Sequence, residues 1–176
     1  MAALRAGADF NVTFVPWTLS QGSRPEEVTP VWNDPNYDAE LLSLAVGVSI
    51  RDQQPDLFLA AHEALFIARH ERAVRLVTFE EIDAVLVGLG VDMDMVRGDV
   101  GTRRPHQVIA DCYQEFSKFE AFGVPTFVVG DDATFVRYMT APGEDPQSSI
   151  SIIESLVSLM ALEPELNEFK HTRLPN

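Results

Sequence analysis

The stretch that decides the fold is Phe-Gly-Val-Pro-Thr-Phe-Val at residues 122–128. A helical pattern precedes it and a β-branched run from Thr126 to Val129 follows, so the segment is a loop that leads from a helix into a strand. Most bonds before proline are trans, but a cis bond turns the chain sharply and leaves the preceding backbone facing outward. From the helix-to-strand context we predict that the Val124–Pro125 bond is cis.

Downstream of this loop the sequence predicts a hairpin and a helix. Gly130-Asp131-Asp132 is a turn, and a second β-rich run spans Thr134 to Met139, which together indicate an antiparallel hairpin. Asp145-Pro146 then supplies a cap and a first-turn proline for a last helix, which Pro164 ends. The apolar face of this helix is expected to include Ile150, Ile153, Val157 and Met160.

Upstream of the loop the sequence predicts a block of helices. The expected starts are Asp38 as a cap, Pro55 in a first turn, Thr78 with Glu81 as a capping box, Asp92 as a cap and Pro105 in a first turn; Gly90 is expected to end the third helix. Helical spacing predicts three buried stripes: Leu41, Leu42, Ala45, Val48 and Ser49; then Phe58, Ala61, Leu65 and Ala68; then Ile109, Cys112, Phe116 and Phe119.

Two segments precede the helices. Residues Phe10 to Val15 alternate apolar and polar side chains, which predicts a half-buried strand that ends at Pro16. Residues 21–36 are rich in glycine, proline, asparagine and aspartate, and we interpret them as an ordered connection.

Composition excludes several classes of function. The 176 residues carry a formal charge of −14 from 27 acidic and 13 basic side chains, which disfavours nucleic acids and anionic membranes as partners. Cys112 is the only cysteine, so an intrachain disulfide, a Cys-x-x-Cys pair and a four-cysteine zinc site are ruled out within these residues. No apolar stretch approaches a membrane span and the first residues lack the apolar core of a secretory signal, so the predicted location is cytoplasmic.

The ordered set of motifs resembles the bacterial DsbA family over roughly residues 9–170. The Gly123–Phe127 segment is similar to the cis-proline loop of thioredoxin-fold proteins. Residues 14–20 resemble the family's second strand and the segment after it, residues 32–35 the loop into its helical insertion, and residues 60–71 an insertion helix. The resemblance implies an α/β, thioredoxin-like fold with an α-helical insertion. It implies one domain over 1–176, with thioredoxin-fold parts at 10–20 and 123–162 and the insertion with its connecting helix at 37–122.

In the family, a central first strand, a Cys-x-x-Cys motif and the helix that it opens precede the strand expected here at Phe10, so no catalytic residue is carried over. The resemblance implies thiol–disulfide oxidoreduction on protein or low-molecular-weight thiols, with a small thiol as a possible co-substrate and Val124, Pro125 and Thr126 as the substrate platform. Because the central strand has no counterpart here, the expected strand at Phe10–Val15 should lie detached, pair with the hairpin, or pair with a second chain as a homodimer.

Three functions stay open at this point. The first is an oxidoreductase with about 25–30 further residues upstream, the length of a strand and a crossover helix. The second is a redox-inactive binding module. The third is chemistry of the kappa-class glutathione transferase and isomerase type, which uses a serine in place of the cysteine.

Other candidate residues favour structural roles. Cys112 lies on an apolar helical stripe, where burial raises a thiol pKa. His62 and His70 lack metal-ligand spacing, which favours a surface or capping role. Asp92, Asp94 and Asp99 lack the glycine and glutamate of a calcium loop, so capping and solvation are expected of them; Trp17 and Trp32 are expected in the core. No metal ligand is predicted.

Overall fold

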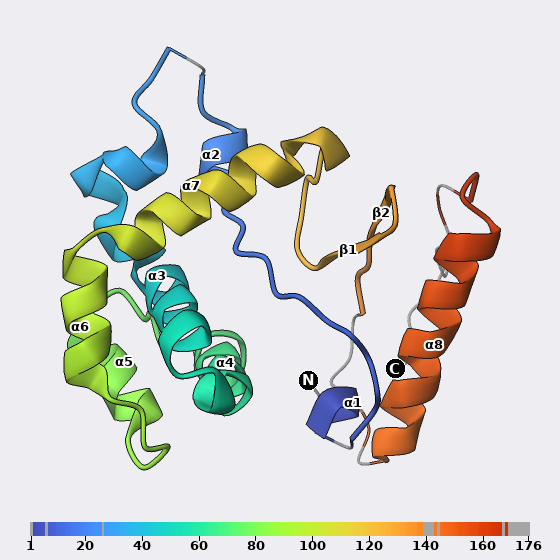
Figure 1. Ribbon diagram of the computed structural model, residues 1–176, viewed down its shortest axis with the longest axis horizontal. Coiled ribbons are helices and arrows are strands. Elements are labelled where there is room, and N and C mark those ends of the chain that lie inside the picture. Colours follow the sequence, from blue (N-terminus) through green and yellow to red (C-terminus); the bar gives the residue numbers. More distant parts are fainter. Residues whose placement is uncertain are drawn as a thin grey trace. The chain divides into compact units, whose positions relative to one another are not determined.

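The computed structural model describes residues 2–5, 7–25, 27–138, 143, 145–166 and 168 (Figure 1). Its internal contacts divide the chain into two compact units. One unit comprises residues 14–118, and the other comprises residues 1–13 with residues 119–176. Each unit is described by itself below, under the names helical unit and hairpin unit.

The helical unit contains the helices that the sequence predicts, with nearly the same bounds. Two short 3-10 helices, Val31–Asn33 and Pro35–Tyr37, and the one-turn helix α2 (Leu19–Gly22) interrupt the connection at residues 21–36. The larger helices are α3 (Asp38–Gln53), α4 (Pro55–His70), α5 (Phe79–Leu86), α6 (Met93–Gly101) and α7 (Arg104–Phe116), which a 3-10 turn at Ser117–Phe119 follows.

Local chemistry accounts for where these helices begin. The Thr78 side chain accepts from the backbone of Glu81 while the Glu81 carboxylate accepts from the backbone of Thr78, a complete capping box. Asp92 accepts from the amide of Met95 at the start of α6. Asp38 does not cap α3, because it is the first helical residue and Tyr37 precedes it, so its carboxylate is free for the ion pair described below. Helix α5 ends at Leu86, earlier than Gly90 predicts.

Helix α3 carries much of the core, since it contacts α4, α6 and α7 (Figure 1). The predicted stripes on α3 and α4 are buried, and Val46 and Ile50 join them with no exposed surface. On α7 only Ile109 of the predicted stripe is fully buried, while Cys112 and Phe116 are half-buried. Apolar burial on several faces of α3 is the main stabilising contribution to this unit.

The hairpin unit contains α1 (Ala2–Arg5), β1 (Thr126–Val129), β2 (Asp132–Phe135) and α8 (Pro146–Leu162). The strands pair antiparallel, from Thr126 opposite Phe135 to Val129 opposite Asp132, with Gly130 and Asp131 as the loop. Gly130 has φ of +63°, which suits the first loop position of a tight hairpin turn. Helix α8 contacts α1 and both strands, and Asp145 caps it by accepting from Gln147.

Two strand predictions are wrong. Phe10–Val15 lies outside any helix or strand of the described residues; Val12 is 48% exposed, so the apolar alternation does not mark a buried face. A strand is defined by pairing, and in the described part of the chain the sheet has two strands, β1 and β2. The second hairpin strand ends at Phe135 instead of Met139, which itself lies outside the described residues.

Candidate functional site

The predicted substrate platform lies in the loop that precedes β1. The Val124–Pro125 peptide bond is cis, as the sequence predicts. Val124 is 58% exposed and Pro125 is exposed. Gly123, which precedes Val124, is buried. A Cβ atom on Gly123 would lie 2.7 Å from Cε2 of Phe135, so this position requires glycine because the aromatic ring packs directly on its backbone.

Hydrogen bonds hold the loop at two points. The Thr126 hydroxyl donates to the Gly123 carbonyl at 2.7 Å, and the Val136 amide donates to the Pro125 carbonyl at 3.1 Å. Neither the amide nor the carbonyl of Val124 bonds to another of the described residues. Within the described part of the chain, Val124 is therefore exposed with neither its amide nor its carbonyl hydrogen-bonded, which is what an extended segment needs for main-chain pairing.

Aromatic side chains flank this loop. Phe122 is 75% exposed and its ring centroid lies 5.1 Å from that of Phe135. The Arg137 guanidinium lies 5.7 Å from the centroid of the Phe135 ring, and Tyr138 is 61% exposed. Phe122 and Phe135 therefore form an aromatic pair at the loop before β1, with the Arg137 guanidinium beside the Phe135 ring. The sequence reasoning missed Phe122 and Phe135 as parts of the candidate site.

The surroundings of Cys112 disfavour its reactive form, the thiolate. Burial raises the pKa of its thiol, Arg51 opposes this rise, and Glu115 and Asp111 add to it. The thiolate is the reactive form, so a raised pKa leaves little of it at neutral pH. The structure thus agrees with the structural role that the sequence predicts for Cys112, although the residue is half-buried instead of fully buried.

The histidines of α4 pack against aromatic rings. His62 packs against Phe14 and Phe58, with ring centroids 5.3 Å and 5.4 Å away, and burial lowers its pKa. The expected surface or capping role is therefore wrong for His62, whose half-buried ring packs against two aromatic side chains. Phe58 contacts it because residues four apart lie on the same helix face. His70 packs against Phe66 at 4.4 Å. Among the described residues no group of three or more histidine, cysteine or acidic side chains is arranged to hold a metal ion.

Trp32 is buried in the core as expected. Trp17 is half-buried and stacks on Tyr113 with ring centroids 4.5 Å apart. Asp92 has the expected role, since it caps α6 by accepting from the amide of Met95. The expectation of capping or solvation is wrong for Asp99, which is buried and forms an ion pair with Arg104. None of these residues supplies a reactive group.

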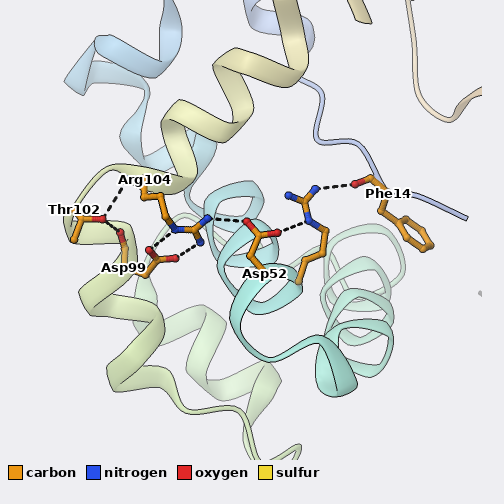
Figure 2. Close-up of polar contacts among 6 residues, drawn as sticks. Phe14, Asp52, Asp99, Thr102 and Arg104 are labelled. Carbon is orange, nitrogen blue, oxygen red and sulfur yellow. Dashed lines mark hydrogen bonds and ion pairs between the residues drawn. The ribbon is translucent and has the colours of Figure 1, made fainter. Parts of the chain in front are cut away.

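A chain of ion pairs crosses the helical unit (Figure 2). Arg104 donates to both carboxylate oxygens of Asp99 and, at 2.7 Å, to Asp52. Arg51 donates to the other oxygen of Asp52 at 2.7 Å and to the carbonyl of Phe14 at 2.8 Å. The pairs join α3, α6 and α7 and fix the backbone at Phe14, so this network positions the segment that enters the helical unit.

The described helices include none that is long and apolar enough to cross a membrane.

The hairpin, the loop before it and the helical unit define a thioredoxin-like protein with a helical insertion, an α/β fold in which the described sheet is small. A profile of the DSBA-like thioredoxin domain matches residues 38–151, which is more than half of the chain. No curated protein matches the sequence. The chain belongs to the DSBA-like thioredoxin domain family, which the sequence motifs predict.

Proposed function

We propose that this chain serves thiol–disulfide exchange by binding the substrate, with Val124, Pro125 and Thr126 as the contact surface for an extended protein segment or a low-molecular-weight thiol. The observation that carries the proposal is the open backbone of Val124, whose amide and carbonyl bond to none of the described residues. Membership of a family of thiol–disulfide oxidoreductase-like domains supports the choice of substrate.

The number of cysteines limits the redox chemistry that these 176 residues can perform. A dithiol that reduces a disulfide forms a mixed disulfide with one cysteine, and a second cysteine then displaces the substrate thiol. The sequence contains Cys112 alone, and the raised pKa of this thiol disfavours even the first attack. The role proposed for these residues is therefore to bind the substrate of thiol–disulfide exchange. The second candidate is a redox-inactive binding module, which the single cysteine favours. A cytoplasmic location and a homodimer stay predictions.

The first test uses Val124, with Val87 as the matched control. Both are exposed valines, at 58% and 78%, and Val87 lies in the helical unit. The probes are glutathione disulfide and a ten-residue peptide joined to its own copy through one cysteine. Val124→Asp is expected to weaken binding of the peptide about tenfold or more, because it places a charge in an apolar contact. Val87→Asp should leave the affinity within about twofold.

The second test uses the hydroxyl that orders the loop. Thr126→Val removes the hydrogen bond to the Gly123 carbonyl but keeps the side-chain shape, whereas Thr126→Ser keeps the donor. Thr126→Val should weaken peptide binding several-fold, and Thr126→Ser should bind nearly as the unaltered chain does. Equal affinities for all four variants, measured by calorimetry, would refute the assignment of this loop.

A further inference from the structure

A cavity of about 370 Å³, about half open to solvent, lies in the helical unit between α3, α5, α6 and the start of α7. This volume is in the range of small-molecule sites, about 300–1,000 Å³. Its apolar lining comes from Leu42, Phe79 and Val100, and its polar lining from Asp38, Arg97, Arg103 and His106.

Arg103 is fixed in place at the edge of this cavity. Its backbone has φ of +63°, a left-handed conformation that an arginine adopts only where its surroundings impose it. The guanidinium donates to both carboxylate oxygens of Asp38, at 2.9 Å and 3.1 Å, and to the Trp32 carbonyl at 2.7 Å. Nη1 and Nη2 are thus engaged, while Nε donates to none of the described residues. This cation is held in position before any ligand arrives.

Arg97 is the second cation of the lining. Its guanidinium lies 4.5 Å from the centroid of the Phe79 ring, and Nη2 pairs with the Asp83 carboxylate. Nε and Nη1 of Arg97 donate to none of the described residues, and the side chain is 37% exposed. Arg97 therefore keeps donors that a ligand can use, on an aromatic support that restricts its motion.

His106 has unmet hydrogen-bonding capacity at the wall of the cavity. The residue is 5% exposed, and Nδ1 is buried without a hydrogen-bond partner among the described residues. Nε2 lies 3.8 Å from the Asp38 carboxylate, which is too far for a hydrogen bond. Burial and the neighbouring Arg103 lower the pKa of His106 while Asp38 opposes them, and the lowered pKa favours the uncharged ring. Buried polar groups normally have partners, which makes this ring a feature that a ligand would explain.

Each guanidinium of the lining is paired with a carboxylate, Arg103 with Asp38 and Arg97 with Asp83, and each keeps N–H donors that these pairs do not use. We propose that this cavity binds a small organic carboxylate with an apolar body, its carboxylate on Arg97, Arg103 and His106 and its body on Phe79 and Leu42. Charge-assisted hydrogen bonds from the remaining guanidinium N–H groups suit a carboxylate, and the apolar walls account for the rest of the ligand.

Two pairs of variants test the site. Arg97→Gln removes a charge from the cavity, and Arg69→Gln removes one from an exposed position on α4 that does not line it. Gly101→Leu adds a side chain to a residue of the lining, at a position where a Cβ atom would meet nothing within 4 Å. Gly98→Leu makes the same change on the same helix, also in open space, at a position outside the lining.

The probes are 2-naphthoate, its uncharged analogue 2-naphthamide, and inorganic phosphate, titrated into the full chain with NMR detection of the His106 ring. The expected result is saturable binding of naphthoate with a shift of the His106 signals, weakened about tenfold by Arg97→Gln and by Gly101→Leu. Arg69→Gln and Gly98→Leu should change the affinity less than about twofold. The proposal would be overturned if naphthamide bound as tightly as naphthoate, or if only phosphate bound. It would also be overturned if the two variants of either pair had equal effects on the affinity, or if binding did not saturate at about 10 mM probe.

Discussion

The close packing of Phe135 on Gly123 predicts that Gly123→Ala destabilises the hairpin unit. The added Cβ would lie 2.7 Å from Cε2, 3.1 Å from Cδ2 and 3.2 Å from Cζ of the Phe135 ring. Carbon atoms rest at about 3.5–4.0 Å, so the ring must move by roughly 0.8 Å or more. Phe135 pairs with Thr126 across the hairpin and packs on Phe122, so the movement disturbs the proposed binding loop.

The expected cost is about 1–3 kcal/mol in the free energy of unfolding, the usual range for forcing extra atoms into a packed site. The matched control is Gly47→Ala in α3, where a Cβ atom meets nothing within 4 Å. That substitution should stabilise the chain by about 0.5–1 kcal/mol, because alanine favours a helix interior over glycine. Urea unfolding measures both values, with tyrosine and tryptophan fluorescence and far-UV circular dichroism as independent probes.

A double-mutant cycle locates the cause. Phe135→Leu removes Cε2 and Cζ, so Gly123→Ala should cost much less in that background than in the unaltered chain. The coupling free energy should be about 0.5–3 kcal/mol. Gly123→Ala that leaves stability unchanged, or that costs the same with leucine at position 135, would refute the packing argument.

Three further predictions concern the helical unit. Hydrogen bonds from Arg104 hold the pKa of Asp99 below its usual value of 3.8 despite burial, so the pair stabilises the fold above that pH and its contribution is lost as the pH falls through the lowered pKa. Asp99→Asn should therefore cost about 1.5–3 kcal/mol in urea unfolding at pH 7, and a cost that does not shrink toward about pH 2 would contradict the assignment. Thr78→Ala should cost about 1 kcal/mol and Thr78→Ser little, because only alanine removes the cap on the amide of Glu81; equal costs would contradict the cap. Cys112 should react slowly with a thiol reagent in the native chain and readily in urea, and fast native labelling would restore a single-cysteine mechanism.

The sequence alone predicts those structural features that depend on residues close together in the chain. The capping box at Thr78, the proline at the start of α4 and the buried face Phe58, Ala61, Leu65 and Ala68 depend on residues within a few turns of one another, and all are confirmed. The hairpin is confirmed for the same reason, since Gly130 and Asp131 fix its turn. The strand at Phe10–Val15 fails because strand formation depends on a partner that alternation alone does not reveal.

The sequence does not predict the ion-pair network or the polar lining of the cavity in the helical unit, because the residues of each lie far apart in the chain. Asp52, which Arg51 also contacts, meets Arg104 only after α3 and α7 pack together. Arg97 and His106 share a cavity with Asp38 for the same reason. Adjacent opposite charges such as Arg51-Asp52 are the one local signal, and by themselves they are typical of a solvated helix face.

The measurement that tests the central claim most directly is a ¹H–¹⁵N titration of the chain with the disulfide-linked peptide. The claim is that the loop before β1 binds an extended segment through the open backbone of Val124. The account predicts saturable shifts that are largest at the amides of Val124 and Thr126 and small throughout residues 14–118. In Val124→Asp the midpoint of the titration should move to at least about tenfold higher peptide concentration. Saturable binding that leaves these two amides unchanged, or whose largest shifts fall within residues 14–118, would contradict it.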